Sequence, residues 1–193
     1  MNIEPSAFPA VFEDKLHGFS SDDCELVGRI ASGNRSDELI TSPIEGDYDI
    51  NHLSRIHEYL FQDVSTYAGV VRDYGISKGL SQFAEISQIA YLFEKELPER
   101  IESLTQSVND EKKYIDGMTD LHSTLDLAHP FRDGNGRATR AFMSQLAKSH
   151  GYELDFSQIE REQWVEACIE SINTGRETLK RSLFAQIVTP THE

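Results

Sequence analysis

His129-Pro-Phe-Arg-Asp-Gly-Asn-Gly-Arg-Ala-Thr-Arg140 is the most informative segment of this 193-residue chain. Pro130 disfavours the α conformation at the residue before it, so a helix that precedes the segment is expected to end at His129. The imidazole is then expected on an exposed turn, with a pKa suited to proton transfer at neutral pH. His129 is therefore the candidate catalytic base.

The glycines of this segment indicate an anion-binding loop. Gly134 and Gly136 allow positive φ angles and a close approach of the backbone to a ligand. The next helix is expected to begin near Gly136, so its free N–H groups and positive dipole end face the loop, an arrangement that suits phosphate. Asn135 adds a neutral donor that can orient an oxygen.

Charged side chains complete the expected phosphate site. Asp133 is a hard oxygen ligand beside it, where Mg²⁺ commonly binds one or two carboxylates together with phosphates. Arg137 and Arg140 are three residues apart and so share one helix face, and guanidinium groups suit bidentate phosphate contacts. Phe131 is interpreted as the structural anchor that holds the loop to the core. A capped helical turn explains each residue alone, but not the combination.

Segment 129–140 resembles the complete Fic motif, HPFx(D/E)GNGRxxR, at every signature position. The resemblance to bacterial Fic (filamentation induced by cAMP) domains covers roughly residues 47–188. It implies an all-α, Fic-fold helical bundle with a small β-hairpin flap. Residues 1–46 are then an N-terminal extension that packs on the core, and residues 47–193 are the Fic domain. The resemblance is carried by Asp49–His57, Leu60–Asp63, Tyr67–Gly69, Ile76–Gly79, Trp164 and Ala167, in addition to the motif.

The resemblance implies a protein adenylyltransferase, which moves AMP from ATP to a hydroxyl side chain of a target protein and releases pyrophosphate. In the Doc relatives, which phosphorylate instead, a lysine replaces the second glycine, so Gly136 favours AMP transfer. His129 is then the base that takes the proton of a target Ser, Thr or Tyr hydroxyl, and Asp133 holds Mg²⁺. The phosphates of ATP are assigned to Gly134, Asn135, Gly136, Arg137 and Arg140.

Two other functions remain open from the sequence. One is transfer of another phosphate-containing group, such as UMP, a phosphoryl group or phosphocholine, on the same scaffold. The other belongs to a different class, a self-inhibited protein that binds nucleotide and acts through interactions with partners.

Residues 70–83 are expected to form an extended hairpin rather than a helix, because Gly75 and Gly79 interrupt the apolar pattern. In Fic domains a flap of this kind is thought to hold a strand of the target protein by β-addition. The resemblance gives this target-docking role to Ile76, Ser77, Lys78 and Gly79. An ordinary connecting hairpin is the alternative.

A possible regulatory string, (S/T)xxxE(G/N), matches Thr41–Gly46. In self-inhibited relatives a helix with this string places its glutamate against the second motif arginine. Pro43 disfavours a continuous helical turn here, so we interpret the match as coincidental and keep Glu45 only as a candidate inhibitory residue. The resemblance then implies the toxin half of a toxin–antitoxin pair. A small antitoxin protein would supply the glutamate, and gyrase-type topoisomerases are the first candidate targets.

Composition limits the location and the partners. The chain has 18 Lys and Arg against 33 Asp and Glu residues, a net charge of −15. Such a chain is not expected to bind nucleic acid through a broad basic surface. No stretch approaches a membrane span, and Met1–Pro5 lacks the basic and apolar regions of a Sec-type signal. We therefore expect a cytoplasmic protein, with secretion as an effector left open, and free thiols at Cys24 and Cys168.

Apolar periodicity predicts the helices. We expect Asp47 or Asp49 to cap a helix, and a kink or break at Pro98. His52 and His57 are not spaced as a metal pair, and Trp164 and Tyr67 are interpreted as core residues. The helices are expected around 21–31, 50–64, 86–104, 114–128, 136–150, 164–172 and 179–187.

Overall fold

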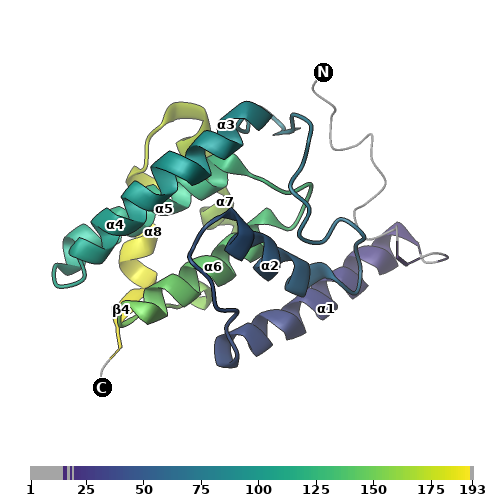
Figure 1. Cartoon of the computed structure of the whole chain (residues 1–193), viewed down its shortest axis with the longest axis horizontal. Coiled ribbons are helices and arrows are strands. Elements are labelled where there is room, and N and C mark those ends of the chain that lie inside the picture. Colours follow the sequence, from purple (N-terminus) through teal and green to yellow (C-terminus); the bar gives the residue numbers. More distant parts are fainter. Residues whose placement is uncertain (1–14, 17, 19, 192–193) are drawn as a thin grey trace.

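Two long helices, α5 (Glu111–Ala128) and α6 (Asn135–Ser149), pack against each other and are joined directly by residues 129–134 (Figure 1). The structure is a computed structural model that describes residues 15–16, 18 and 20–191. Both helices turn a buried apolar face toward the centre, so the connecting loop is held at the core. The apolar residues that they bury include Tyr114, Met118, Leu121, Leu125, Phe142, Met143 and Leu146.

The N-terminal helix α1 (Ser21–Thr41) packs against α6 and against α2 (Ile50–Phe61). It is ten residues longer than the helix expected at 21–31, because it continues through Gly33. A glycine in a helix costs roughly 1 kcal/mol relative to alanine. Burial of Cys24 and Leu39 on either side of Gly33 offsets this cost.

Helix α2 begins at one of the two predicted caps. The carboxylate of Asp49 accepts a hydrogen bond from the backbone N–H of His52 at 2.8 Å, so Asp49, and not Asp47, is the N-cap. Leu53, Ile56 and Leu60 are buried, as their helical spacing predicted. This face of α2 lies against α6, and His57 on α2 bonds to the loop 129–134.

The predicted irregularity near Pro98 takes the form of a π-helical segment. Helix α3 (Ile86–Tyr91), η2 (Leu92–Glu96) and α4 (Leu97–Gln106) follow one another without a break. The N–H of Leu97 bonds to the carbonyl of Leu92, five residues earlier. Because proline has no N–H and crowds the preceding turn, a wider turn just before it relieves the conflict.

Two small antiparallel sheets accompany the helices. Strands β1 (Ser77–Lys78) and β2 (Ser81–Gln82) form a hairpin, which confirms the expected extended segment. The second sheet, β3 (Tyr152–Leu154) with β4 (Val188–Pro190), was not predicted. Its strands are three residues long and far apart in sequence, so neither shows a clear period-2 pattern.

The remaining helical elements are η3 (Phe156–Gln158), α7 (Arg161–Thr174) and α8 (Thr178–Ile187). Helices α7 and α8 pack on α5, and η3 packs on α8. The observed architecture confirms the prediction of a mainly helical fold with a β-hairpin. Among the described helices, none combines the length and apolar character needed to cross a bilayer.

Candidate active site

His129 ends helix α5 in the left-handed conformation, with φ 40° and ψ 59°. This conformation is rare for a residue with a side chain, and Pro130 enforces the departure from the helix. Nδ1 lies 3.2 Å from the carbonyl oxygen of Asp126. A carbonyl can only accept, so Nδ1 carries the proton and Nε2 keeps its lone pair for an incoming hydroxyl.

The imidazole of His129 is more enclosed than the sequence predicted. Its side chain is 21% exposed, and the ring of Phe83 stacks on it with 3.7 Å between centroids. Burial lowers the pKa of His129 to about 4, although the nearby carboxylate of Asp126 acts in the opposite direction. The expectation of an exposed turn with an ordinary pKa was therefore wrong, because a residue after the hairpin covers the ring.

The loop that follows is shaped from within by Asn135. Its side-chain oxygen accepts from the N–H of Phe131 at 2.8 Å, and its amide nitrogen donates to the carbonyl of Phe131 at 2.7 Å. Asn135 is 4% exposed, so its side chain faces the protein. The expected side-chain donor to a ligand is corrected to a clip that closes the loop, which leaves the backbone N–H for an anion.

Gly134 is the N-cap of α6 and has a φ of 78°. A Cβ atom at Gly134 would collide with the ring of Phe61 and approach Nε2 of His57 to 3.0 Å. Gly136 differs, because it lies inside the helix and its φ is not positive. A Cβ there would meet only the Arg140 side chain, at 3.8 Å. The predicted positive φ is thus limited to Gly134, and the small size of Gly136 leaves room for a ligand.

His57 connects three segments around this loop. Its Nδ1 accepts from the N–H of Gly69 at 2.9 Å, and its Nε2 donates to the carbonyl of Asp133 at 2.8 Å. The ring also stacks on Phe131, 3.9 Å between centroids. Both ring nitrogens are occupied by the backbone, so His57 is a framework residue, and burial lowers its pKa to about 4.

Asp133 presents its carboxylate at the surface of the loop. Oδ1 accepts from the N–H of Gly134 at 2.6 Å, and the residue is exposed. A single exposed carboxylate suits Mg²⁺, which keeps several waters and completes its shell with phosphate oxygens. The residues present therefore fit the expected cation.

The two motif arginines contact different elements beside the start of α6. Arg137 donates to the hydroxyl of Ser32 on α1 at 2.7 Å, and its guanidinium lies 4.5 Å from the centroid of Phe61. Arg140 faces η3, where its guanidinium lies 5.9 Å from the centroid of Phe156. Both remain cationic, because burial lowers the pKa of an arginine from a very high value.

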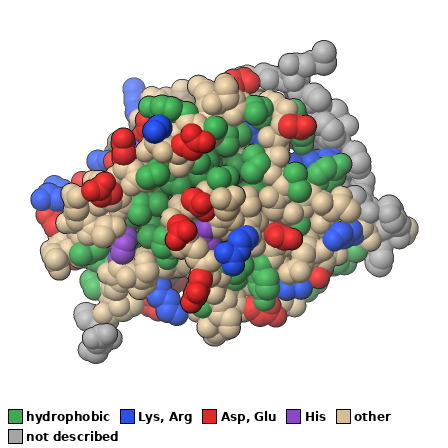
Figure 2. All heavy atoms as spheres, in the orientation of Figure 1, with side chains coloured by type: hydrophobic (Ala, Val, Ile, Leu, Met, Phe, Trp, Pro, Cys, Tyr) green, Lys and Arg blue, Asp and Glu red, His purple; other side chains and the backbone are tan. Residues whose placement is uncertain are grey.

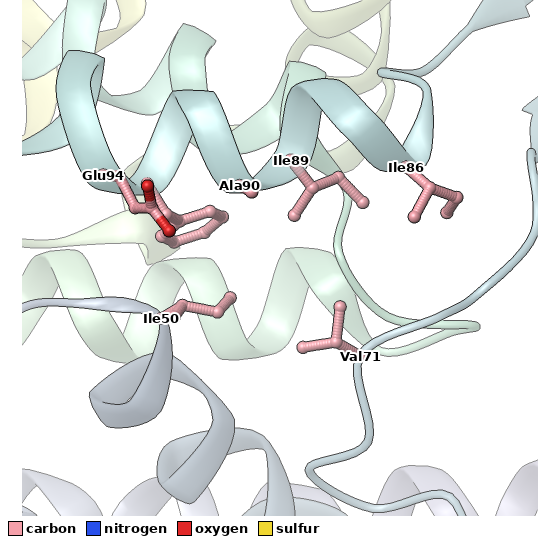
Figure 3. Close-up of a pocket in the computed structure, with 7 residues that line it drawn as sticks. Ile50, Val71, Ile86, Ile89, Ala90 and Glu94 are labelled. Atoms are coloured by element: carbon pink, nitrogen blue, oxygen red, sulfur yellow. The ribbon is translucent and has the colours of Figure 1, made fainter.

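Arg140 opens onto a pocket of about 370 Å³ that Phe156, Ile159, Arg161 and Trp164 also line. A different pocket of about 240 Å³ lies between the start of α2 and α3 (Figure 3). Its lining is apolar except for Glu94. Phosphate needs donors and positive charge, so the pocket at Arg140 is the better candidate for part of a nucleotide site.

Three possible metal ligands also meet near His129. Atoms of His122, Asp126 and Cys168 lie within 4.8 Å of one another. The ammonium of Lys180, which is fully buried, lies 3.3 Å from the carboxylate of Asp126. Because this ammonium already neutralises the carboxylate and would repel a further cation, we interpret the cluster as a buried ion pair.

Other predicted residues lie away from this centre. Thr41 is the last residue of α1, and Glu45 is exposed in the following non-helical segment, where its carbonyl accepts from Arg55 at 2.9 Å. The inhibitory role of Glu45 stays a prediction. Trp164 packs partly buried against the core, whereas Tyr67 is 46% exposed and was wrongly interpreted as a core residue.

Charge is not concentrated on the visible face. Figure 2 shows Lys and Arg side chains scattered among Asp and Glu, rather than gathered in a broad basic area. Arg137 and Arg140 instead provide local positive charge beside the start of α6, which suits an anionic ligand.

Sequence reasoning missed three residues of the site: Ser32, Arg72 and Phe83. None belongs to a recognisable motif. Ser32 and Arg72 are buried at 0% and 4% exposure, and a buried polar residue looks like any surface residue in a single sequence. Apolar periodicity alone gave no reason to place Phe83 on His129.

Comparison with known proteins identifies the family of this chain. Residues 47–147 match the Fic/DOC family. Protein adenylyltransferase VbhT of Bartonella schoenbuchensis is 36% identical over 141 residues, which make up 71% of this chain and 29% of the relative. This chain therefore spans less than a third of the length of VbhT. A probable protein adenylyltransferase Fic of Escherichia coli (strain K12) is 34% identical over 146 residues, 74% of this chain and 70% of the relative.

Solved structures share the fold. The N-terminal Fic domain of a VirB-translocated Bep effector protein from Bartonella quintana, with bound ADP, has a TM-score of 0.80 and 28% identity. It covers 91% of this chain and 89% of that one. BepC from Bartonella tribocorum, with bound AMPPNP, has a TM-score of 0.79 over 95% of this chain and 100% of that one. At 24% identity, the likeness to BepC supports the fold alone.

Proposed function

The chain belongs to the Fic/DOC family and is related to bacterial protein adenylyltransferases, and we propose that it transfers AMP from ATP to a hydroxyl side chain of a target protein. The observation that carries this proposal is the pairing of a neutral histidine with an anion-binding helix start six residues later. His129 has a free Nε2 lone pair, and α6 begins at Asn135. The Bartonella quintana relative has bound ADP, which supports nucleotide binding by this fold.

Proton removal is the role of His129 in this reaction. The hydroxyl of a target Ser, Thr or Tyr approaches Nε2 and gives up its proton while its oxygen attacks the α-phosphorus of ATP. A new P–O bond forms to the target oxygen, the bond between the α-phosphorus and the bridging oxygen breaks, and pyrophosphate leaves. Since the pKa of His129 is lowered to about 4, the imidazole is neutral and able to accept a proton at neutral pH.

Backbone N–H groups of the loop and the two motif arginines stabilise the negative charge of the phosphates. The N–H groups of Asn135 and Gly136 belong to the first turn of α6, which has no intrahelical acceptor for them. Arg137 and Arg140 flank this turn and contact the outer phosphates, and preorganised donors of this kind dominate the catalysis of phosphate-group transfer. Asp133 would hold Mg²⁺, whose chemistry when bound is to neutralise phosphate charge.

The proposal also covers the regulation of the protein and its target. An antitoxin that supplies an inhibitory glutamate would occupy the space beside Arg140, and the chain would then be the toxin of the pair. The proposed target surface is the hairpin that contains Ile76, Ser77, Lys78 and Gly79, which pairs with an extended segment of the target. A gyrase-type topoisomerase is the first target to test. Self-inhibition by Glu45 is the competing arrangement, and it requires the segment after α1 to rearrange.

A labelling experiment tests the function. Purified protein is mixed with α-labelled ATP, Mg²⁺ and a bacterial lysate, in parallel with His129→Ala and Glu45→Gly. We expect a labelled protein band with the wild type that disappears in His129→Ala, while the affinity for ATP stays close to that of the wild type. Label that persists in His129→Ala would contradict the base assignment. Label that appears only in Glu45→Gly would replace the antitoxin with self-inhibition.

Transfer from a different nucleotide or phosphate donor is the alternative reaction on this scaffold. Intact-mass measurement of the modified target separates the cases, because AMP, UMP, phosphoryl and phosphocholine groups add different masses. Addition of AMP is the expected result, and addition of another group would leave the roles of the residues in place but change the substrate. ATP binding without any transfer would favour an interaction protein.

A further inference from the structure

Arg72 is a buried arginine whose side chain bonds to main-chain oxygens. It is 4% exposed, and its guanidinium donates to the carbonyls of His129 at 2.7 Å, Ala128 at 3.1 Å, Tyr74 at 2.7 Å and Ala84 at 2.6 Å. A planar guanidinium can reach several acceptors in fixed directions. The side chain therefore acts as a rigid connector between backbone segments.

These four carbonyls belong to two parts of the proposed site. Tyr74 and Ala84 lie on either side of the β1–β2 hairpin, whereas Ala128 and His129 are at the C-terminal end of α5. The last carbonyls of a helix lack intrahelical partners, and a cation near them is favourable. Arg72 thus satisfies the end of the helix that carries the base and fixes both ends of the hairpin to it.

The backbone strengthens this connection. The N–H of Arg72 donates to the carbonyl of Pro130 at 2.9 Å, and the N–H of Ala84 donates to the carbonyl of Leu127 at 2.9 Å. Val71 forms an isolated β-bridge with Phe131. The segments before and after the hairpin are consequently both bonded to residues 127–131.

Phe83 makes the direct contact between the hairpin segment and the base. Its ring lies nearly parallel to the imidazole of His129, with an interplanar angle of 21° and 3.7 Å between centroids. One face of the imidazole is covered, whereas the lone pair of Nε2 lies in the plane of the ring and is not directed at Phe83. The stack also fixes the ring orientation that the hydrogen bond from Nδ1 to Asp126 favours.

We propose that Arg72 and Phe83 are positioning residues that hold the target-docking hairpin and the base His129 in one rigid frame, an inference that rests on the proposed function. A target segment bound to the hairpin is then presented to Nε2 at a set distance, without a contact of either residue to ATP. The phosphate loop is held separately, by Asn135 and His57. Loss of the frame should therefore slow transfer and spare ATP binding.

Kinetic measurements on paired variants test the proposal. The substrate is the target protein that the labelling experiment identifies. Arg72→Lys keeps the positive charge but replaces the planar guanidinium with a single ammonium group. Phe83→Ala removes the stack from a partly exposed position, and Phe83→Tyr keeps an aromatic ring. Arg29→Lys, on an exposed arginine of α1, is the matched control.

For Arg72→Lys and Phe83→Ala we expect kcat to fall on the order of 10²-fold, as for misplacement of a reacting group by about 1 Å. The Kd for ATP should stay within about twofold, since the phosphate donors of the α6 start are unchanged. Phe83→Tyr and Arg29→Lys should retain kcat near that of the wild type. A parallel loss of ATP binding, or an unchanged kcat in Phe83→Ala, would overturn the proposal. If Arg72→Lys does not fold, the comparison of Phe83→Ala with Phe83→Tyr tests the proposal.

A spectroscopic readout separates this proposal from the proposed function. In the free protein, the ring current of Phe83 should shift the NMR signals of the His129 imidazole, and Phe83→Ala should remove that shift while Phe83→Tyr keeps it. If the wild type transfers no nucleotide but the shift depends on Phe83, the contact stands and the proposed function fails. If the His129 signals are the same in Phe83→Ala, the positioning role is wrong.

Discussion

The hydroxyl of Ser32 accepts a hydrogen bond from the guanidinium of Arg137 at 2.7 Å, although the two residues are 105 positions apart. Ser32 is fully buried and donates in turn to the carbonyl of Gly28 at 2.7 Å. Helix α1, which lies before the segment that matches the Fic/DOC family, therefore contributes a contact to an arginine of the motif.

Removal of this contact should weaken nucleotide binding. We expect Ser32→Ala to raise the Kd for ATP about three- to tenfold, since a single hydrogen bond contributes roughly 0.5–1.5 kcal/mol. Isothermal titration calorimetry with ATP and Mg²⁺ measures this effect. Ser36→Ala is the control, because the hydroxyl of Ser36 bonds within α1, to the carbonyl of Ser32. Equal affinities in the two variants would show that Ser32 does not orient Arg137.

The Asn135 clip should contribute to the stability of the fold. Asn135→Ala leaves the buried N–H and carbonyl of Phe131 without these partners, which costs about 1–3 kcal/mol for each unsatisfied group. Urea unfolding should therefore show a clear loss of stability relative to the wild type. The exposed Asn109 provides a control, and Asn109→Ala should unfold near the wild-type midpoint. Similar midpoints for both variants would contradict the role of the clip.

The two glycines of the loop should respond differently to alanine. Gly134→Ala forces a Cβ against Phe61 at a φ of 78°, so we expect it to lower stability by at least about 1 kcal/mol. Gly136→Ala sits in helix α6 and should keep or slightly raise stability, but weaken ATP binding, because its Cβ occupies the space that phosphate approaches. Thermal unfolding and ATP titration of both variants check this contrast. Unimpaired ATP binding in Gly136→Ala would count against the loop as the phosphate site.

Buried histidines should make the fold acid-sensitive. Burial lowers the pKa of His122 to about 3 from an unfolded value near 6.5. A lowered folded-state pKa gives stability that is fully present above the unfolded pKa and is lost as pH falls toward the folded one. His122→Phe should therefore reduce the loss of stability between pH 6.5 and 4 by roughly 3 kcal/mol. The ring would retain contact with Trp164 and Phe184, which surround His122. Urea unfolding across this pH range is the measurement, and identical pH profiles would refute the prediction.

The pH dependence of transfer should reflect the enclosed position of His129. Its pKa is lowered to about 4, so protonation of the base should reduce kcat/KM only well below pH 6, rather than near the ordinary histidine value. Initial rates between pH 5 and 8 should therefore show no loss of activity centred at pH 6.5. A midpoint near 6.5 would indicate that the imidazole is exposed in the active protein. Phe83→Ala should move the midpoint upward, because it exposes the ring to solvent.

Local sequence patterns were sufficient to predict much of the fold. The spacing of Leu53, Ile56 and Leu60 predicted one face of α2, and the pairing of Pro130 with His129 predicted where α5 ends. These predictions hold because helix periodicity and proline sterics act over a few residues. The length of α1 and the β3–β4 sheet were not predicted, since packing between distant segments overrides the cost of Gly33 and pairs strands of three residues.

The sequence by itself determined the order of chemical groups from His129 to Arg140, and with it the family and the start of a phosphate-binding helix. Tertiary structure alone decided the environment of those groups. Only folding brings Phe83 onto the imidazole, turns the amide of Asn135 inward, and places Ser32 and Arg72 beside the motif. The physical reason is that desolvation and hydrogen-bond geometry depend on neighbours in space, which a linear pattern of residues does not specify.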